Sequence, residues 1–158
     1  MRSPQGKAHT AQMAGFYSTE NFQPHEGLGY LLAVVRRRAL DLLEPELAPL
    51  GLTAVQAIVI AGIASGTTTA AGFSKLLQHD PGAMTRVIDR LEKAGYVRRV
   101  RNPGDRRSSH LELTGAGRKA LPKLRGAAVK GFNHMLRRFS NAEAKQLIAY
   151  LKRLAVDA

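Results

Sequence analysis

The segment from Asp80 to Gly117 constrains the fold of this 158-residue chain more than any other. Asp80 is a typical helix N-cap, and Pro81 suits the first helical position, where its missing N–H costs little. Gly95 marks the end of the apolar pattern that follows. Beyond it the residues alternate as two strands around a turn at 102–105. The segment therefore predicts a short helix followed by a β-hairpin.

Three helices are predicted ahead of this segment, from apolar residues at helical spacing. The first covers 25–44, where Pro45 and Pro49 stop or kink it. The second, about 53–65, is nearly all apolar and should be the buried centre of the domain. The third, about 70–77, is joined to the next helix by a three-residue turn. This third helix and the helix that begins at Pro81 together predict a helix-turn-helix, and the hairpin that follows is its wing.

Two more helices are predicted after the hairpin. One begins at Thr114 as N-cap and runs to about Phe139, with a kink expected at Pro122. The other opens at the capping box formed by Ser140 and Glu143. Their apolar stripes exceed what one small winged domain can cover, which predicts apolar surface available to a partner subunit. The predicted fold class is mainly α, a winged helix-turn-helix with a two-stranded wing plus N- and C-terminal helices that form a dimerisation region.

The predicted organisation is one domain over about 25–156. Residues 1–24 are expected to form a flexible tail, with Phe16, Tyr17 and Phe22 as isolated apolar points. Dimerisation helices are expected at 25–50 and 114–158. The winged helix-turn-helix is expected at 51–113.

The charge of the chain points to a polyanion partner. Lys and Arg total 24 against 12 Asp and Glu, giving a net charge of +12. Eight basic residues but three acidic ones lie between Pro81 and His110. Because cations that neutralise phosphates release counterions, this concentration favours nucleic acid over a surface that is basic only for solubility.

Other classes of function are disfavoured. The chain has no cysteine, which excludes disulfides, thiolate metal sites and a thiol peroxide sensor within it, and its five histidines lack the spacing of zinc ligands. Asp89 and Glu92 can share a helix face, but they lie among arginines, which disfavours a nuclease metal site. We expect no metal, no cofactor and no enzymatic activity. No apolar run of signal-peptide or membrane-spanning length appears, which predicts a cytoplasmic protein without a membrane partner.

A basic helix has the width of the DNA major groove, and an arginine-tipped ribbon suits the minor groove. The outer face of the predicted helix also carries Lys93. The small residues at its start allow close backbone approach, and a helix N-terminus attracts phosphate. Arg90 has an alternative role, since it could pair with Asp89, Glu92 or Asp105. The predicted contacts of this helix with double-stranded DNA are Gly82, Ala83, Thr85, Arg86 and Arg90.

The sequence resembles the MarR family of bacterial transcription regulators. Asp105-x-Arg107, followed after five residues by Leu113-Thr114-x-x-Gly117, matches that family's wing signature, and 82–95 is similar to its recognition helix. The resemblance covers about 25–156. It implies a homodimer built from the first and last helices, and wings that reach each half of a pseudo-palindromic operator. It also implies repression relieved by small, often aromatic, anionic ligands.

The wing contacts rest partly on this resemblance. It identifies Arg107 with the family arginine that enters the minor groove, with Asp105 holding it in place and Arg106 beside it. The arginines nearer the base are expected to touch phosphates, or to keep a solvated strand edge from pairing. The predicted wing contacts are Arg98, Arg99, Arg101, Asp105, Arg106 and Arg107.

The resemblance also implies an effector pocket between the dimerisation helices and the winged region. Core packing explains most of its candidate residues equally well. Arg37 is the candidate partner for an anionic effector. The predicted lining is Tyr30, Val34, Arg37, Ile58 and Leu111.

The predicted function is a sequence-specific, ligand-responsive repressor that binds a pseudo-palindromic operator as a homodimer. The alternative is a non-specific, nucleoid-type architectural DNA-binding protein, for which the high charge would suffice. A specific regulator predicts several kcal/mol of preference for its operator, whereas the alternative predicts equal affinity for random DNA.

Overall fold

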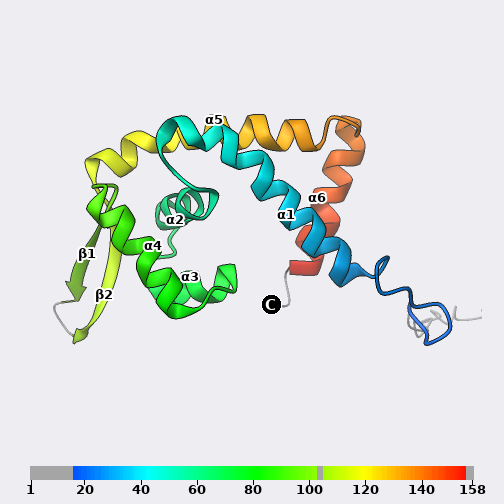
Figure 1. Ribbon diagram of the computed structural model, residues 1–158, viewed down its shortest axis with the longest axis horizontal. Helices are drawn as coiled ribbons and strands as arrows, with labels where there is room; N and C mark the ends of the chain where they lie inside the picture. The colour runs from blue at the N-terminus through cyan, green and yellow to red at the C-terminus, as the bar shows by residue number, and fades with distance from the viewer. Residues whose placement is uncertain (1–15, 103–104, 156–158) are drawn as a thin grey trace, which may run out of the picture. The chain divides into compact units, whose positions relative to one another are not determined.

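A computed structural model describes residues 16–102 and 105–155, without the side chains of 102 and 105–108. The chain divides into two compact units, Met1–Arg36 and Arg37–Ala158, called the first and second units below. Figure 1 labels the elements in chain order. They are α1 Leu28–Leu47, the 3-10 turn η1 Ala48–Leu50, α2 Ala54–Ala64, α3 Ala70–Leu77, α4 Pro81–Lys93, β1 Val97–Asn102, β2 Asp105–Leu113, α5 Gly115–Met135 and α6 Asn141–Ala155. The predicted fold class, mainly α with a two-stranded wing, is confirmed.

In the first unit, the aromatic residues ahead of α1 form a cluster. Tyr17 makes edge-to-face contacts with Phe16 and Phe22, at centroid distances of 4.9 and 5.3 Å. The Tyr17 hydroxyl also accepts a hydrogen bond from the Leu28 amide at 3.0 Å, which satisfies one of the unpaired N–H groups at the start of α1. The prediction of isolated apolar points is therefore wrong for these rings. The rest of the predicted tail, residues 1–15, lies outside the described residues.

The ends of α1 differ from the prediction. The helix begins at Leu28 rather than 25, and it continues past Pro45 to Leu47 instead of ending near 44. The 3-10 turn then runs to Gly51, whose φ of 66° lies in the left-handed region that suits glycine. The chain thus tightens gradually into a 3-10 turn, and Pro49 lies within that turn rather than in an α-helix.

In the second unit, helices α2, α4 and α6 begin at caps that the sequence predicts. Thr53 and Gln56 form the expected capping box, and Asp80 accepts a hydrogen bond from the Ala83 amide at 2.7 Å. The Ser140 and Glu143 pair opens α6 in the same way. In contrast, α5 ends at Met135, about one turn before the predicted Phe139, because the chain leaves the helix in a turn ahead of the α6 cap.

The core of the second unit is built around α2, as predicted. Val59 and Ile60 of α2 are fully buried. They share one core with α3, α4 and the base of the sheet, and burial of such side chains is the main force that holds these elements together. The largest fully buried side chains are Phe73, Leu47, Ile60, Met84, Ile88, Leu91, Val59 and Val97.

The wing is one antiparallel pair in which Val97 lies opposite Leu113, Arg99 opposite Leu111 and Arg101 opposite Ser109. The second strand begins at Asp105, earlier than the predicted 109, and the register shifts between Arg101 and Asn102. Figure 1 shows the ribbon beside α4. The base of the wing is anchored, since Val97, Leu111 and Leu113 belong to the core.

Among the described residues, no single helix is long and apolar enough to cross a membrane; the pair Leu28–Leu50 and Ala54–Ala64 reaches that length and composition only across an 83° bend.

Candidate nucleic-acid interface

Helix α4 presents one apolar and one polar face. Met84, Ile88 and Leu91 are completely buried, so the opposite face is fixed towards solvent. At the first turn, the Thr85 hydroxyl donates a hydrogen bond to the Pro81 carbonyl at 2.9 Å. Its remaining role towards a ligand is therefore that of an acceptor, which narrows the contacts that Thr85 can make with DNA.

The basic side chains of α4 lie on the exposed face. Arg86, Arg90 and Lys93 are exposed, and within the described part of the chain they form no ion pair. The Nη1 atom of Arg86 lies 3.6 Å from the point where a Cβ on Gly82 would be. The Arg86 guanidinium therefore lies close to the N-terminal turn of α4, where the helix dipole favours anions.

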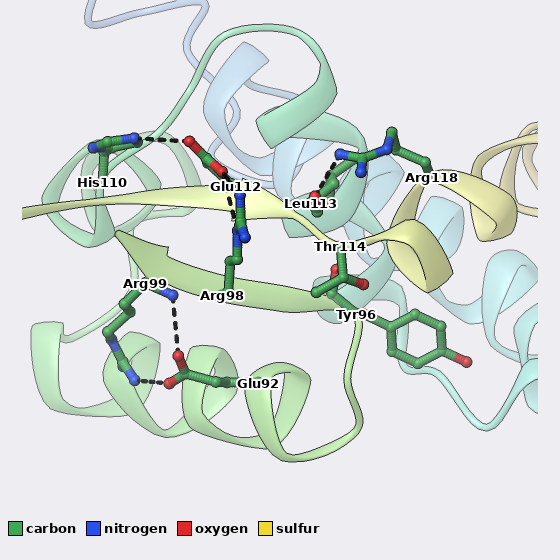
Figure 2. Close-up of polar contacts among 9 residues, drawn as sticks. All are labelled: Glu92, Tyr96, Arg98, Arg99, His110, Glu112, Leu113, Thr114 and Arg118. Atoms are coloured by element: carbon green, nitrogen blue, oxygen red, sulfur yellow. Dashed lines mark hydrogen bonds and ion pairs between the residues drawn. The ribbon is translucent and has the colours of Figure 1, made fainter. Parts of the chain in front are cut away.

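The alternative role considered for Arg90, pairing with the acids of its own helix, is not what the structure shows. Asp89 and Glu92 bind Arg99 of β1 instead, and Figure 2 shows the contact of Arg99 with Glu92. The Arg99 Nη2 atom lies 2.6 Å from Asp89 Oδ1, and its Nη1 donates to Glu92. The hydrogen bond to Asp89 is the main cause that raises the pKa of Arg99 above its ordinary value. The third candidate partner, Asp105, has its side chain outside the described residues.

The other face of the ribbon carries a second ion pair. Arg98 donates from Nε and Nη2 to Glu112 Oε2, at 3.1 and 2.6 Å, across the two strands. His110 Nε2 lies 3.1 Å from the other oxygen of Glu112. Figure 2 shows these three side chains on the face of the sheet opposite Arg99. The hydrogen bond from Arg98, followed by that with His110, lowers the pKa of Glu112.

The outer part of the wing is only partly described. Arg101 is exposed and has no ion pair with any residue whose side chain is described. The side chains of Asp105, Arg106 and Arg107 lie outside the description. Their assigned contacts with the minor groove therefore stay predictions.

The Leu-Thr-x-x-Gly motif has a structural explanation at the junction of wing and α5. The Thr114 hydroxyl donates to the Gly95 carbonyl at 2.5 Å and accepts from the Gly117 amide at 3.1 Å. A Cβ on Gly117 would lie 2.1 Å from the Tyr96 carbonyl oxygen, so no side chain fits there. The threonine thus joins the end of α4 to the start of α5, and the glycine permits the close approach.

The second unit contains an apolar pocket of about 460 Å³ between α1, α2 and α5. Of the predicted pocket residues, Ile58 lines it. Leu111 is instead buried and lines an adjoining cleft of about 510 Å³, which shares Ala64 and Leu121 with the pocket. The full lining of the apolar pocket is Leu43, Leu47, Ala54, Ala57, Ile58, Ala61, Ala64, Ser65, Leu121, Leu124, Arg125, Ala128 and Phe132.

The predicted cationic partner for an effector, Arg37, lies outside this pocket. Its side chain is 85% exposed and lies 3.7 Å from Asp41, one helical turn away. Tyr30 and Val34 are exposed residues of the first unit, whereas the whole lining comes from the second. The charged residue of the lining is Arg125, which sequence reasoning missed. The sequence signal that could have identified Arg125 is its position directly after Leu124, which belongs to the apolar stripe of α5.

Within the described ranges, no group of three or more His, Cys, Asp or Glu side chains could hold a metal ion.

Comparison with known proteins places this geometry in context. A family model described as "MarR family" matches residues 50–108, from the end of η1 to the outer part of the wing. The chain is also similar to the multiple antibiotic resistance protein MarR of Escherichia coli, with 38% identity over 91 residues. That match spans 57% of this chain and 63% of the length of the curated relative.

Solved structures resemble a larger part of the chain. The reduced form of MarR from E. coli matches with a TM-score of 0.71 and 31% identity, over 81% of this chain and 96% of that one. A mutant MarR from E. coli complexed with operator DNA has a TM-score of 0.69 and 29% identity, over 80% and 92%. A Mycobacterium tuberculosis MarR family protein in complex with salicylic acid has a TM-score of 0.71 and 26% identity, over 81% and 96%.

Proposed function

The chain belongs to the MarR family, and we propose that it is a sequence-specific regulator of transcription that binds operator DNA. The observation that carries the proposal is the exposed polar face of α4. Arg86 and Arg90 point away from the core and form no ion pair with the described residues, beside a wing whose base is anchored in that core. The similar E. coli protein that was crystallised with operator DNA supports this use of the fold.

We further propose that the protein acts as a homodimer, so that two copies of α4 reach the two halves of a pseudo-palindromic operator. The support is apolar surface on the last two helices. Phe132 of α5 and Ile148, Leu151 and Leu154 of α6 are all exposed in the single chain. Sedimentation equilibrium would test the dimer, and a monomer at micromolar concentration would contradict it.

Repression that is relieved by a small anionic effector is the third part of the proposal. The support is the pocket of about 460 Å³, whose apolar lining and single described cation, Arg125, suit an aromatic carboxylate. Titration calorimetry with salicylate, comparing the unchanged protein with Arg125→Ala, would test it. Equal binding by both proteins would remove Arg125 from the proposal.

The wing tip supplies the minor-groove contact in this proposal. We expect Arg107→Ala to abolish tight operator binding while the dimer stays intact, because a narrow minor groove concentrates negative potential that an arginine matches. A gel shift at physiological salt, with sedimentation as control, measures both. Unchanged affinity would contradict the assignment of Arg107.

The experiment that tests the function as a whole is genome-wide capture of bound DNA, followed by competition between the captured operator and random duplex. A regulator should prefer its operator by several kcal/mol. Equal affinity would favour the alternative, a nucleoid-type architectural protein, which the net charge of +12 also permits. Either role places the protein in the cytoplasm, where bacterial DNA lies.

A further inference from the structure

The base of the wing is tied to the helix-turn-helix on both of its edges. The Arg99 amide of β1 donates to Glu92 Oε1 on α4 at 3.0 Å. Directly opposite in the register, the Leu111 amide of β2 donates to the Thr68 carbonyl just before α3, at 2.7 Å. These two N–H groups therefore point outwards from the ribbon at the same level. One binds a side chain of α4 and the other binds the backbone before α3.

Arg99 adds its side chain to the tie on the α4 edge. Its guanidinium binds Glu92 through Nη1 and Asp89 through Nη2, so that three donors of one residue meet two carboxylates of one helix. The Arg99 side chain is 34% exposed, compared with 63% for the neighbouring Arg98. A guanidinium fork held at two acids is more ordered than a single exposed ion pair, because the planar fork is pre-organised for such bonds.

Besides this tie, the wing is held to the helix-turn-helix by its buried base and by the hydrogen bond from the Leu111 amide to the Thr68 carbonyl. Without Arg99, the carboxylates of Asp89 and Glu92 would stand alone on a face that approaches phosphates, where like charges repel. Arg99 neutralises these acids and connects β1 to α4.

We infer that Arg99 is a positioning residue, which fixes the wing to the recognition helix so that both grooves are read by one rigid body, and that it does not contact phosphate itself. The inference rests on the proposed function, since it assumes that α4 and the wing bind the same DNA.

The decisive comparison is between removing the cation and removing its acids. Dissociation constants for operator and for random duplex are measured for Arg99→Gln and for the double variant Asp89→Asn with Glu92→Gln. Because both remove the ion pairs between Arg99 and α4, we expect both to lower the ratio of operator to random affinity by about tenfold, the size of the penalty for one mismatched base pair. The matched control is Lys130→Gln on α5, which removes one positive charge from an exposed ion pair with Glu46 at 3.4 Å, leaves α4 and the wing untouched, and should leave the ratio within about twofold.

A phosphate contact by Arg99 predicts the opposite result for the acids. Removing the charges of Asp89 and Glu92 would then free the guanidinium, and affinity for operator and random DNA would rise together with an unchanged ratio. That outcome would overturn the inference. A ratio of operator to random affinity that falls only as far as each variant loses thermal stability would also overturn it, because that result would identify a merely structural role for Arg99.

A second measurement needs no DNA. Amide hydrogen exchange at Arg99 reports its bond to Glu92, and Glu92→Ala should accelerate that exchange by about tenfold or more, whereas Arg98→Gln should not. Unchanged exchange at Arg99 in Glu92→Ala would show that the tie is absent in solution and would overturn the inference. Equal affinity of the unchanged protein for operator and random DNA would overturn the proposed function itself, and with it the inference. A specific protein whose ratio the variants leave unchanged would overturn the inference alone.

Discussion

The arginines of α4 and those at the base of the wing carry the same charge, yet they lie in opposite electrostatic surroundings. Arg86 and Arg90 stand on an exposed helix face without an ion pair to any described residue. Arg98 and Arg99 each bind at least one carboxylate, from a facing strand or from α4. The difference shows that the count of basic residues overstates the number of cations free to bind DNA.

The acids decide which arginine is free. Asp89 and Glu92 belong to the same helix as Arg90, but their carboxylates are taken by an arginine of the adjacent strand. A cation whose charge is already matched gains little from a phosphate, since it must first give up its partner. We therefore assign the reading of DNA to α4 and to the outer wing, and assign cohesion to the base of the wing. Four predictions test this division.

Of these four, the largest effect is expected from Arg86→Ala. If the free guanidinium at the start of α4 contacts a base edge, its removal should weaken operator binding by about 5- to 150-fold, equivalent to about 1–3 kcal/mol, and relax preference at one position of each half-site. Fluorescence anisotropy with single-substitution operators measures both. An unchanged dissociation constant would mean that α4 does not read DNA through Arg86. It would contradict the assignment of DNA reading to the exposed arginines of α4.

Arg101→Ala should have a smaller and less selective effect. An exposed arginine on the strand is placed to neutralise a phosphate, so operator and random DNA should both bind more weakly by a similar factor. The slope of log affinity against log salt should fall by about 0.9 for each phosphate that is no longer neutralised. A decrease in affinity confined to the operator would instead identify a base contact and would assign Arg101, like Arg86, to the reading of DNA sequence.

Arg98→Gln should change DNA affinity by less than about twofold, because the guanidinium is committed to Glu112 and exposed ion pairs contribute little. The same anisotropy assay applies, with Arg101→Ala as the matched variant on the same strand. A decrease as large as that of Arg101→Ala would show that the ion pair opens on DNA, and would remove the distinction drawn between paired and free arginines.

The smallest effect concerns pH. The pKa of Glu112 is lowered from its ordinary 4.5, so its ionised form stabilises the folded state above that value, and the contribution is lost as pH falls through the lowered pKa. The melting temperature of the unchanged protein should therefore exceed that of Glu112→Gln near neutral pH, and the two should converge well below pH 4.5. A difference that persists at the lowest pH would show that the ion pair with Arg98 is not its source.

Much of the fold could be predicted because its signals are local. The caps at Thr53, Asp80 and Ser140 each bind an amide three residues along the chain, within one turn of helix. Apolar spacing likewise identified α2 as the buried centre. The ends of α1 and α5 were predicted less well, because a helix can continue through a proline or stop in a turn according to what it packs against.

The pocket shows the limit of that reasoning. Arg37 was the predicted partner for an anionic effector, but its exposed side chain lies near Asp41 and does not line the pocket. Arg125 lines the pocket because α5 packs against α2, and no short stretch of sequence contains both helices. The contact of Tyr17 with Phe22 was missed for a related reason, since these two rings meet only once the chain between them has turned.

The sequence alone determined the winged helix-turn-helix, the basic character of its α4 and wing, and the Thr114–Gly117 spacing, because capping, helical periodicity and strand alternation act over a few residues. Only the tertiary structure decided which of the described arginines are paired with acids. Arg99 meets acids seven and ten residues earlier, and Arg98 meets one fourteen residues later. Ion pairing falls off within a few ångströms, so its outcome depends on how strand and helix pack rather than on how many charges a segment contains.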